Sequence, residues 1–83
     1  MLDESIVIKK GDYILTYYEN LNAVNIVTNV TDTVFVCDDC VILDITGTSP
    51  SRDLNIPRSD ILELIGDEEA YEKYKQENAE YFV

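Results

Sequence analysis

The stretch LNIPRSDILELI (residues 54–65) sets two short apolar runs on either side of Pro57-Arg58-Ser59-Asp60. Short apolar runs that flank a polar group with a proline are typical of two β-strands joined by a tight connection. Arg58 would then lie at the tip of that connection. Its position needs a physical reason, because the chain has 17 acidic residues and only 6 basic ones.

The residues before this stretch are also typical of β structure. Residues 1–65 are rich in Val, Ile, Thr and Tyr and are broken by short polar groups, as in a domain built of short strands. The alternation of the run from Val24 shifts near Val30, as in a bulged or strongly bent strand. The clearest loop is TGTSPSRD, residues 46–53. The predicted strands, the last two of them interrupted, are 5–9, 12–19, 23–31, 33–45 and 53–65.

The pattern changes at Gly66, and residues 67–83 predict a C-terminal helix. Acidic residues fill its first turn, near the positive end of the helix dipole. One face then repeats at spacings of three and four, with Ala70, Tyr71, Tyr74, Asn78, Tyr81 and Phe82. We expect this face to pack on the β part or on a neighbouring subunit rather than to stack on a ligand. The chain is then a single domain, with residues 1–66 as the β part and 67–83 as the helix.

Composition limits what the protein can bind. A chain of 83 residues has a small core, so a regular fold or self-association is expected to help its stability. The formal net charge of −11 argues against a general nucleic-acid coat and against an anionic membrane surface. Any phosphate contact must be confined to a local patch. With no signal-peptide pattern and no apolar run of membrane-spanning length, we expect a soluble, cytoplasmic protein.

The sequence carries few groups suited to catalysis or metal binding. It has no histidine, which removes the commonest general base and zinc ligand. CDDC (residues 37–40) has the cysteine spacing of zinc and redox motifs, but it is a single pair inside an apolar, strand-like run. We expect Cys37 and Cys40 to be reduced, metal-free and at least half-buried. These observations predict a protein that is not an enzyme and uses no cofactor, metal or small-molecule substrate.

Two segments resemble the Sm-like (LSm) family, whose members form rings and bind RNA. NIVTNVTDTVFVCDDCVIL (25–43) is similar to the family's first motif, an apolar strand that ends in acidic residues. IPRSDILELI (56–65) is similar to the second motif, in which Arg or Lys precedes a glycine, and here Ser59 takes the glycine position. The resemblance covers about residues 11–65, and more narrowly the short acidic sequence resembles Sm-like proteins attributed to marine cyanophages. An early glycine and the N-terminal helix of the family are missing, and the turn in the first motif is shortened to TDT (31–33).

The resemblance implies a small, mainly β fold: a five-stranded, strongly bent Sm-like (SH3-type) barrel, here with a C-terminal α-helix. Such subunits pair the edge of one strand with that of the next subunit, which implies a ring of about five to seven copies. Loops repeated around a pore would then hold single-stranded RNA or DNA, with a guanidinium at each Arg58. The implied nucleic-acid-binding residues are Asp32, Thr33, Arg58 and Ser59, with Lys9 and Lys10 adding phosphate attraction if they lie on the same side.

Two other interpretations stay open at this point. Arg58 can instead pair with Asp60 or Asp32 at a subunit joint. The acidic surface can also serve as a protein-interaction module or a nucleic-acid mimic, which would occupy a basic site on another protein.

Overall fold

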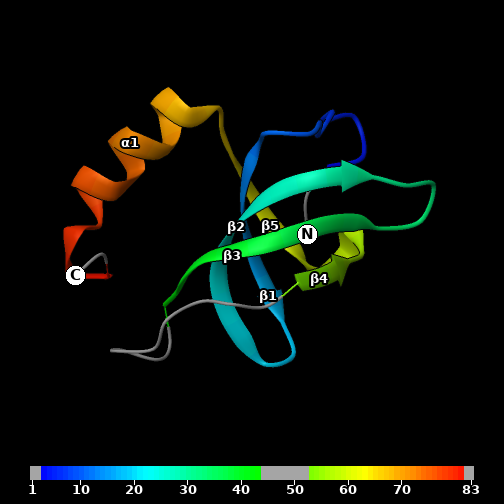
Figure 1. Ribbon diagram of the computed structural model, residues 1–83, viewed down its shortest axis with the longest axis horizontal. Helices are drawn as coiled ribbons and strands as arrows, with labels where there is room; N and C mark the ends of the chain where they lie inside the picture. The colour runs from blue at the N-terminus through cyan, green and yellow to red at the C-terminus, as the bar shows by residue number, and fades with distance from the viewer. Residues whose placement is uncertain (1–2, 44–52, 82–83) are drawn as a thin grey trace.

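The computed structural model describes residues 3–43 and 53–81. Over these residues the protein is mainly β, with a five-stranded antiparallel sheet and a C-terminal helix (Figure 1). The elements in chain order are β1 (Tyr13–Tyr18), β2 (Leu21–Val30), β3 (Phe35–Ile42), β4 (Asp53–Ile56), the 3-10 helix η1 (Arg58–Asp60), β5 (Ile61–Gly66), α1 (Glu68–Glu77) and the 3-10 helix η2 (Ala79–Tyr81). None of the helices in these ranges is long and apolar enough to cross a bilayer.

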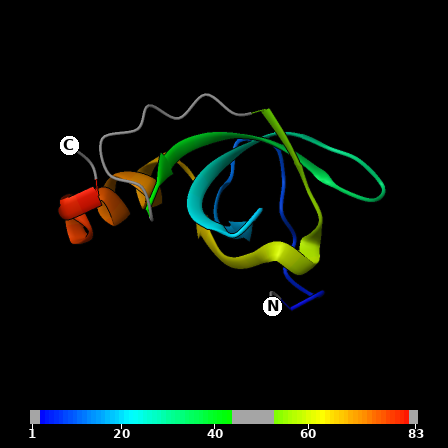
Figure 2. The same cartoon turned by 90° about the horizontal axis from the view of Figure 1, so that it is seen from below.

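The strand order is β4-β3-β2-β1-β5, and the sheet curls around its interior (Figure 2). The sheet is not closed, because β4 pairs with β3 and β5 pairs with β1, which leaves β4 and β5 as its two edges. The register of β2 against β3 shifts between Val24 and Asn25 and again between Val27 and Asn29. Such irregularities increase strand twist and bending, and here they come earlier than the bend predicted near Val30.

The predicted strand at residues 5–9 is wrong. The chain turns at its start, where the Asp3 carboxylate accepts from the Ser5 amide at 2.8 Å and the Asp3 carbonyl accepts from the Ile6 amide at 3.1 Å. Ile8 is nevertheless buried in the core, whereas Val7 is 79% exposed. The alternation in the sequence therefore indicates an extended segment with one buried face. Such a segment can bury that face without pairing with a strand of the sheet.

The other predicted strands are confirmed, with adjusted ends. Residues 12–19 and 23–31 become β1 and β2, and 33–45 contains β3, which runs without interruption over its eight residues. Residues 44–52, which hold the end of that prediction and most of the predicted 46–53 loop, lie outside the described residues. The interruption expected in 53–65 is confirmed, because η1 separates β4 from β5.

η1 forms where the proline fixes the backbone. Pro57 has φ −73° and an extended ψ of 154°, and its carbonyl accepts from the Asp60 amide at 3.0 Å. Proline cannot donate to a ladder, so β4 ends before it. Arg58 is thereby held at the connection between the two edge strands, as the sequence predicts.

The core lies inside the curl of the sheet. Its apolar cluster joins the N-terminal segment to all five strands: Ile8, Ile14, Val27, Phe35, Cys37, Leu54, Ile56 and Ile61. A polar network continues the same face of the sheet, where the Thr16 hydroxyl donates to Asn25 Oδ1 at 2.6 Å and Asn25 Nδ2 donates to Asp39. Because the buried amide of Asn25 is hydrogen-bonded at both ends, its burial avoids the cost of an unpaired polar group.

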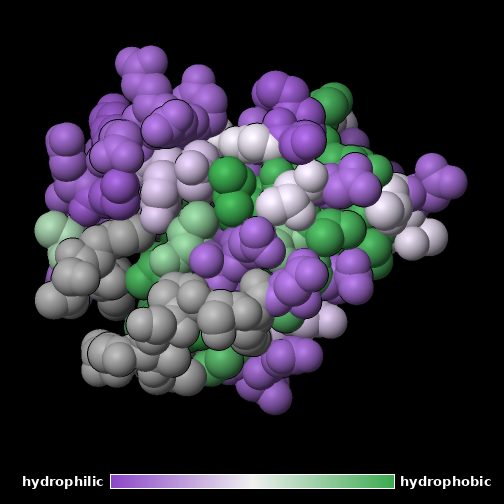
Figure 3. Space-filling model, in the orientation of Figure 1, coloured by the Kyte–Doolittle hydropathy of each residue, from purple (hydrophilic) through white to green (hydrophobic). Residues whose placement is uncertain are grey.

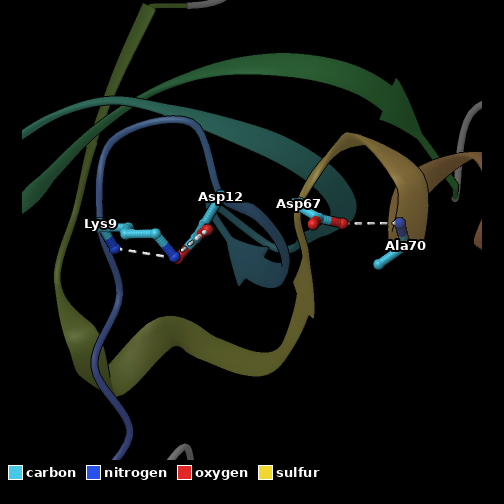
Figure 4. Close-up of polar contacts among 4 residues, drawn as sticks. All are labelled: Lys9, Asp12, Asp67 and Ala70. Carbon is cyan, nitrogen blue, oxygen red and sulfur yellow. Dashed lines mark hydrogen bonds and ion pairs between the residues drawn. The ribbon is translucent and has the colours of Figure 1, made fainter.

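Asp12 anchors the segment that leads into β1 (Figure 4). Its carboxylate is buried and accepts from the Lys9 amide at 3.0 Å and from Lys9 Nζ at 3.2 Å. The backbone closes the same turn, since the Asp12 amide donates to the Lys9 carbonyl at 3.1 Å. Gly11 provides the positive φ of 93° that this turn requires.

We predict that Asp12→Ala destabilises the fold by about 1–3 kcal/mol, because it leaves the Lys9 amide without its acceptor. Lys9→Ala is the matched control and should cost less than about 1 kcal/mol, because its ammonium is exposed and screened by water. Urea unfolding of both variants measures the difference. Equal losses would show that the ammonium, rather than the backbone turn, carries the contribution.

The C-terminal helix predicted over 67–83 is confirmed as α1, followed by η2, and the last two residues of the prediction, 82–83, lie outside the described residues. The Asp67 side chain caps it by accepting from the Ala70 amide at 3.0 Å (Figure 4). Gly66 has φ 127°, and a Cβ there would lie 2.9 Å from Ala70 Cβ, so only glycine fits the passage from β5 into α1. The Tyr71 ring stacks on Tyr13 with centroids 4.0 Å apart, which fixes α1 against the outer face of the sheet.

Candidate nucleic-acid interface

A cavity of about 300 Å³ lies where three distant segments meet: the N-terminal segment, the turn between β2 and β3, and η1. Its apolar walls include Ile6, Val30 and Phe35. The volume is at the lower end of the range of small-ligand sites, which leaves room for one nucleobase.

Arg58 contributes the cation of this cavity. Its guanidinium Nη1 donates to the Asp3 carbonyl at 3.2 Å, and its Cζ lies 5.5 Å from the centroid of the Phe35 ring. A guanidinium has five N–H donors in one plane, and among residues 3–43 and 53–81 the Asp3 contact uses one of them. The ring and the N-terminal segment therefore orient Arg58 while donors stay available for a ligand.

The turn between β2 and β3 is organised by Thr31. Its hydroxyl donates to the Val34 carbonyl at 2.9 Å and accepts from the Val34 amide at 3.1 Å, and the backbone amide of Thr31 also donates to that carbonyl at 3.0 Å. A fourth, longer bond runs from the Thr33 amide to the Thr31 hydroxyl at 3.4 Å. These bonds fix the loop backbone and leave the Asp32 and Thr33 side chains exposed at the rim of the cavity.

The electrostatic character of the cavity is mixed. Arg58 lines the cavity together with two acidic residues, Glu4 and Asp32. Nearby, hydrogen bonds from Ser5 hold the pKa of the Asp3 carboxyl below its usual value, with a smaller contribution from the Arg58 charge. A site of this kind is poorly suited to bind a bare phosphate. It is better suited to a planar group with both donors and acceptors on its edge.

The structure brings together three of the six predicted binding residues. Asp32, Thr33 and Arg58 line the cavity. Ser59 is exposed next to Arg58 in η1, and Lys9 and Lys10 lie in the exposed turn before β1; these three are not among the lining residues. Lys9 also directs its ammonium at the Asp12 carboxylate.

Sequence reasoning missed Phe35 and Glu4, and it included Thr31 only as part of the TDT turn. The sequence predicts Phe35 as an apolar strand residue. Its contact with Arg58 could not be predicted, because the two positions are distant along the chain. Thr31 carries a recognisable signal, because a threonine at a strand end commonly bonds to the backbone of the turn that follows. Glu4 reaches the site through the N-terminal segment, whose path no local pattern predicts.

The two cysteines lie on opposite sides of β3. Cys37 is fully buried in the core, where burial and the nearby Asp38 and Asp39 charges raise its pKa to about 12. Cys40 lies on the outer face and is hydrogen-bonded to Tyr71 of α1, and burial raises its pKa as well. Within residues 3–43 and 53–81, no group of three His, Cys, Asp or Glu side chains is arranged to hold a metal ion. CDDC therefore acts as part of a strand, with its thiols on separate faces.

Comparisons of this chain with protein-family models, with curated proteins and with solved structures found no match.

Proposed function

We propose that this chain is an Sm-like ring subunit that binds single-stranded RNA, or single-stranded DNA, and takes part in nucleic-acid processing or regulation. One observation carries the proposal. Asp32 and Thr33 come from the first motif and Arg58 from the second, and these distant positions line one cavity. The N-terminal segment completes the cavity with Ile6 and Val7.

A uracil base suits the chemistry of this cavity. Its flat ring can lie against the apolar wall and the Arg58 guanidinium, where stacking and cation–π attraction act together. Its ring N–H can donate to the Asp32 carboxylate, and its carbonyl oxygens can accept from Arg58 or from the Thr33 hydroxyl. Affinity would then come mainly from base contacts, which is reasonable for a protein with a formal net charge of −11.

The sheet edges support the ring. β4 and β5 are the two ends of the sheet, and exposed edges of this kind favour pairing with another chain. Joining β4 of one copy to β5 of the next is a head-to-tail contact, which closes into a ring when its rotation permits. We propose about five to seven copies, in which the open sheets together complete the Sm-like barrel arrangement and repeat each cavity around a pore.

A second function is favoured by the surface of α1. This helix carries the exposed acids Glu68, Glu69, Glu72 and Glu77, and the surface over it is mainly hydrophilic (Figure 3). A dense carboxylate surface of this kind suits an acidic protein-interaction module or a nucleic-acid mimic. Binding to a basic nucleic-acid enzyme, without any affinity for oligonucleotides, would favour this alternative.

Light scattering and fluorescence anisotropy test the proposal together. We expect a homo-oligomer at micromolar protein concentration and saturable binding of a labelled oligo-U. Because few phosphates are contacted, binding should weaken only modestly as salt rises. A monomer at this concentration would contradict the ring. Lack of oligo-U binding even at low salt would contradict the nucleic-acid function.

A further inference from the structure

α1 and β5 form a groove beside the β5 edge of the sheet, where β1 is the one strand that pairs with β5 within the part of the chain that the structure describes. The groove has a volume of about 210 Å³. Glu63 and Ile65 of β5 form one side, and Ala70, Lys73, Tyr74 and Glu77 of α1 form the other. These four helix positions follow the spacing of a single helix face. A strand added to β5 would therefore lie next to this face of α1.

The faces of the sheet indicate which side of an added strand would meet α1. Across the β1–β5 ladder, Glu63 pairs with Leu15, which neighbours the buried Ile14 in sequence and so lies on the opposite face. Tyr13 lies on the same outer face as Leu15, and it is the residue on which Tyr71 of α1 stacks. The groove therefore opens on the outer face of the sheet.

β4, at the opposite edge, presents a polar outer face. Leu54 and Ile56 point into the core, and Asp53 and Asn55 alternate with them and are exposed. When β4 of a neighbouring copy continues the sheet beyond β5, its Asp53 and Asn55 come to lie on the face that α1 overhangs. The lengths also agree, since four strand residues span about 13 Å and the ten residues of α1 span about 15 Å.

Charge favours the same partner at one position of the groove, Lys73. Asp53 is directly opposite Asp38 across the β3–β4 ladder, and both side chains are exposed. Like charges at such positions repel each other. Lys73 lines the groove with two acidic residues, Glu63 and Glu77, and it is exposed on the helix face that would cover the added strand. An incoming carboxylate is therefore attracted at Lys73 alone among the residues that line the groove.

We propose that α1 is a clamp for the neighbouring subunit: it covers β4 of a second copy and places Lys73 against that copy's Asp53. This inference rests on the proposed ring and adds to it the role of the helix and a specific ion pair between subunits. The groove is complete only when the second copy supplies its strand. The pair would also relieve the repulsion between Asp38 and Asp53.

A charge-swap series tests the clamp. The variants are Lys73→Glu, Asp53→Lys and the double variant that carries both. The matched control is Lys10→Glu, which changes the charge equally at an exposed position that lies outside both edge strands. Circular dichroism confirms folding, and sedimentation at a series of protein concentrations gives the concentration at which each oligomer dissociates.

Each single variant is expected to raise the dissociation concentration at least tenfold, and the double variant to return it to within about threefold of wild type. Lys10→Glu should match wild type. Single variants that assemble normally, or a double variant that is not rescued, would overturn the clamp while the ring stands. A wild type that stays monomeric would overturn both. An oligomer that follows this pattern but does not bind oligo-U would support the clamp and contradict the nucleic-acid function alone.

Discussion

Arg58→Ala is expected to weaken oligo-U binding at least tenfold while the oligomer stays intact. Loss of a stacking side chain costs on the order of 1–3 kcal/mol per bound base, and Arg58 is the cation that lines the cavity with Asp32 and Thr33. The substitution also removes the contact with the Phe35 ring, but a partly exposed cation–π pair contributes only about 0.5–1 kcal/mol to stability. Anisotropy titrations measure the affinity, and light scattering measures the assembly.

Two control variants separate the contributions of Arg58. Arg58→Lys keeps the positive charge but loses the planar guanidinium and its fork of N–H donors. If the guanidinium stacks on a base, Arg58→Lys should therefore bind oligo-U only slightly better than Arg58→Ala. Lys75→Ala removes the same charge from α1, where Lys75 pairs with Glu72, and should change little. Equal affinities for wild type and Arg58→Ala would favour the acidic interaction module. Full recovery in Arg58→Lys would show that charge alone is used.

The positions of most strands along the chain and the terminal helix could be predicted because local patterns specify them. Pro57 marks the break between β4 and β5 because proline has no backbone N–H to donate, and Gly66 with Asp67 marks the start of α1. The alternation in residues 5–9 predicts a strand that does not form. Whether such a segment joins a ladder depends on which partner edge is available, and that is a property of the whole fold. The sheet also curls without closing, which no local pattern indicates.

The candidate site was predictable only where the family resemblance aligned distant motifs. That resemblance placed Asp32, Thr33 and Arg58 in one region, and they line one cavity. Charge alone makes Lys9 a candidate, whereas its amide and ammonium both bond to the buried Asp12. The walls of the cavity depend on how the N-terminal segment crosses the end of the sheet, so Glu4 and Phe35 could not be assigned from the sequence.

The free energy of unfolding is expected to fall steeply as the pH rises from about 9 to about 12, because of Cys37. Burial raises the pKa of this thiol from 9.0 to about 12, and its Sγ donates to the Phe35 carbonyl at 3.4 Å inside the core. In this pH range the unfolded chain loses the thiol proton while the folded protein keeps it. The unfolded state then binds fewer protons, so stability decreases with pH, by up to about 1.4 kcal/mol per pH unit. Over three units the loss reaches about 4 kcal/mol, which is a large share of the stability of a small domain.

Cys37→Ala isolates this contribution, because the titrations of the remaining groups continue in both proteins. Tyr13, Cys40 and Tyr71 also have pKa values raised by burial, and they lower stability at alkaline pH in the variant as in wild type. Near pH 8 the variant should be less stable than wild type, since a buried sulfur is replaced by a smaller group. Urea unfolding at intervals of pH should show this difference shrink and then reverse between about pH 9 and 12. A difference that stays constant would mean that the Cys37 thiolate forms in the folded protein as easily as in the unfolded chain, so that the core around β3 admits water at high pH.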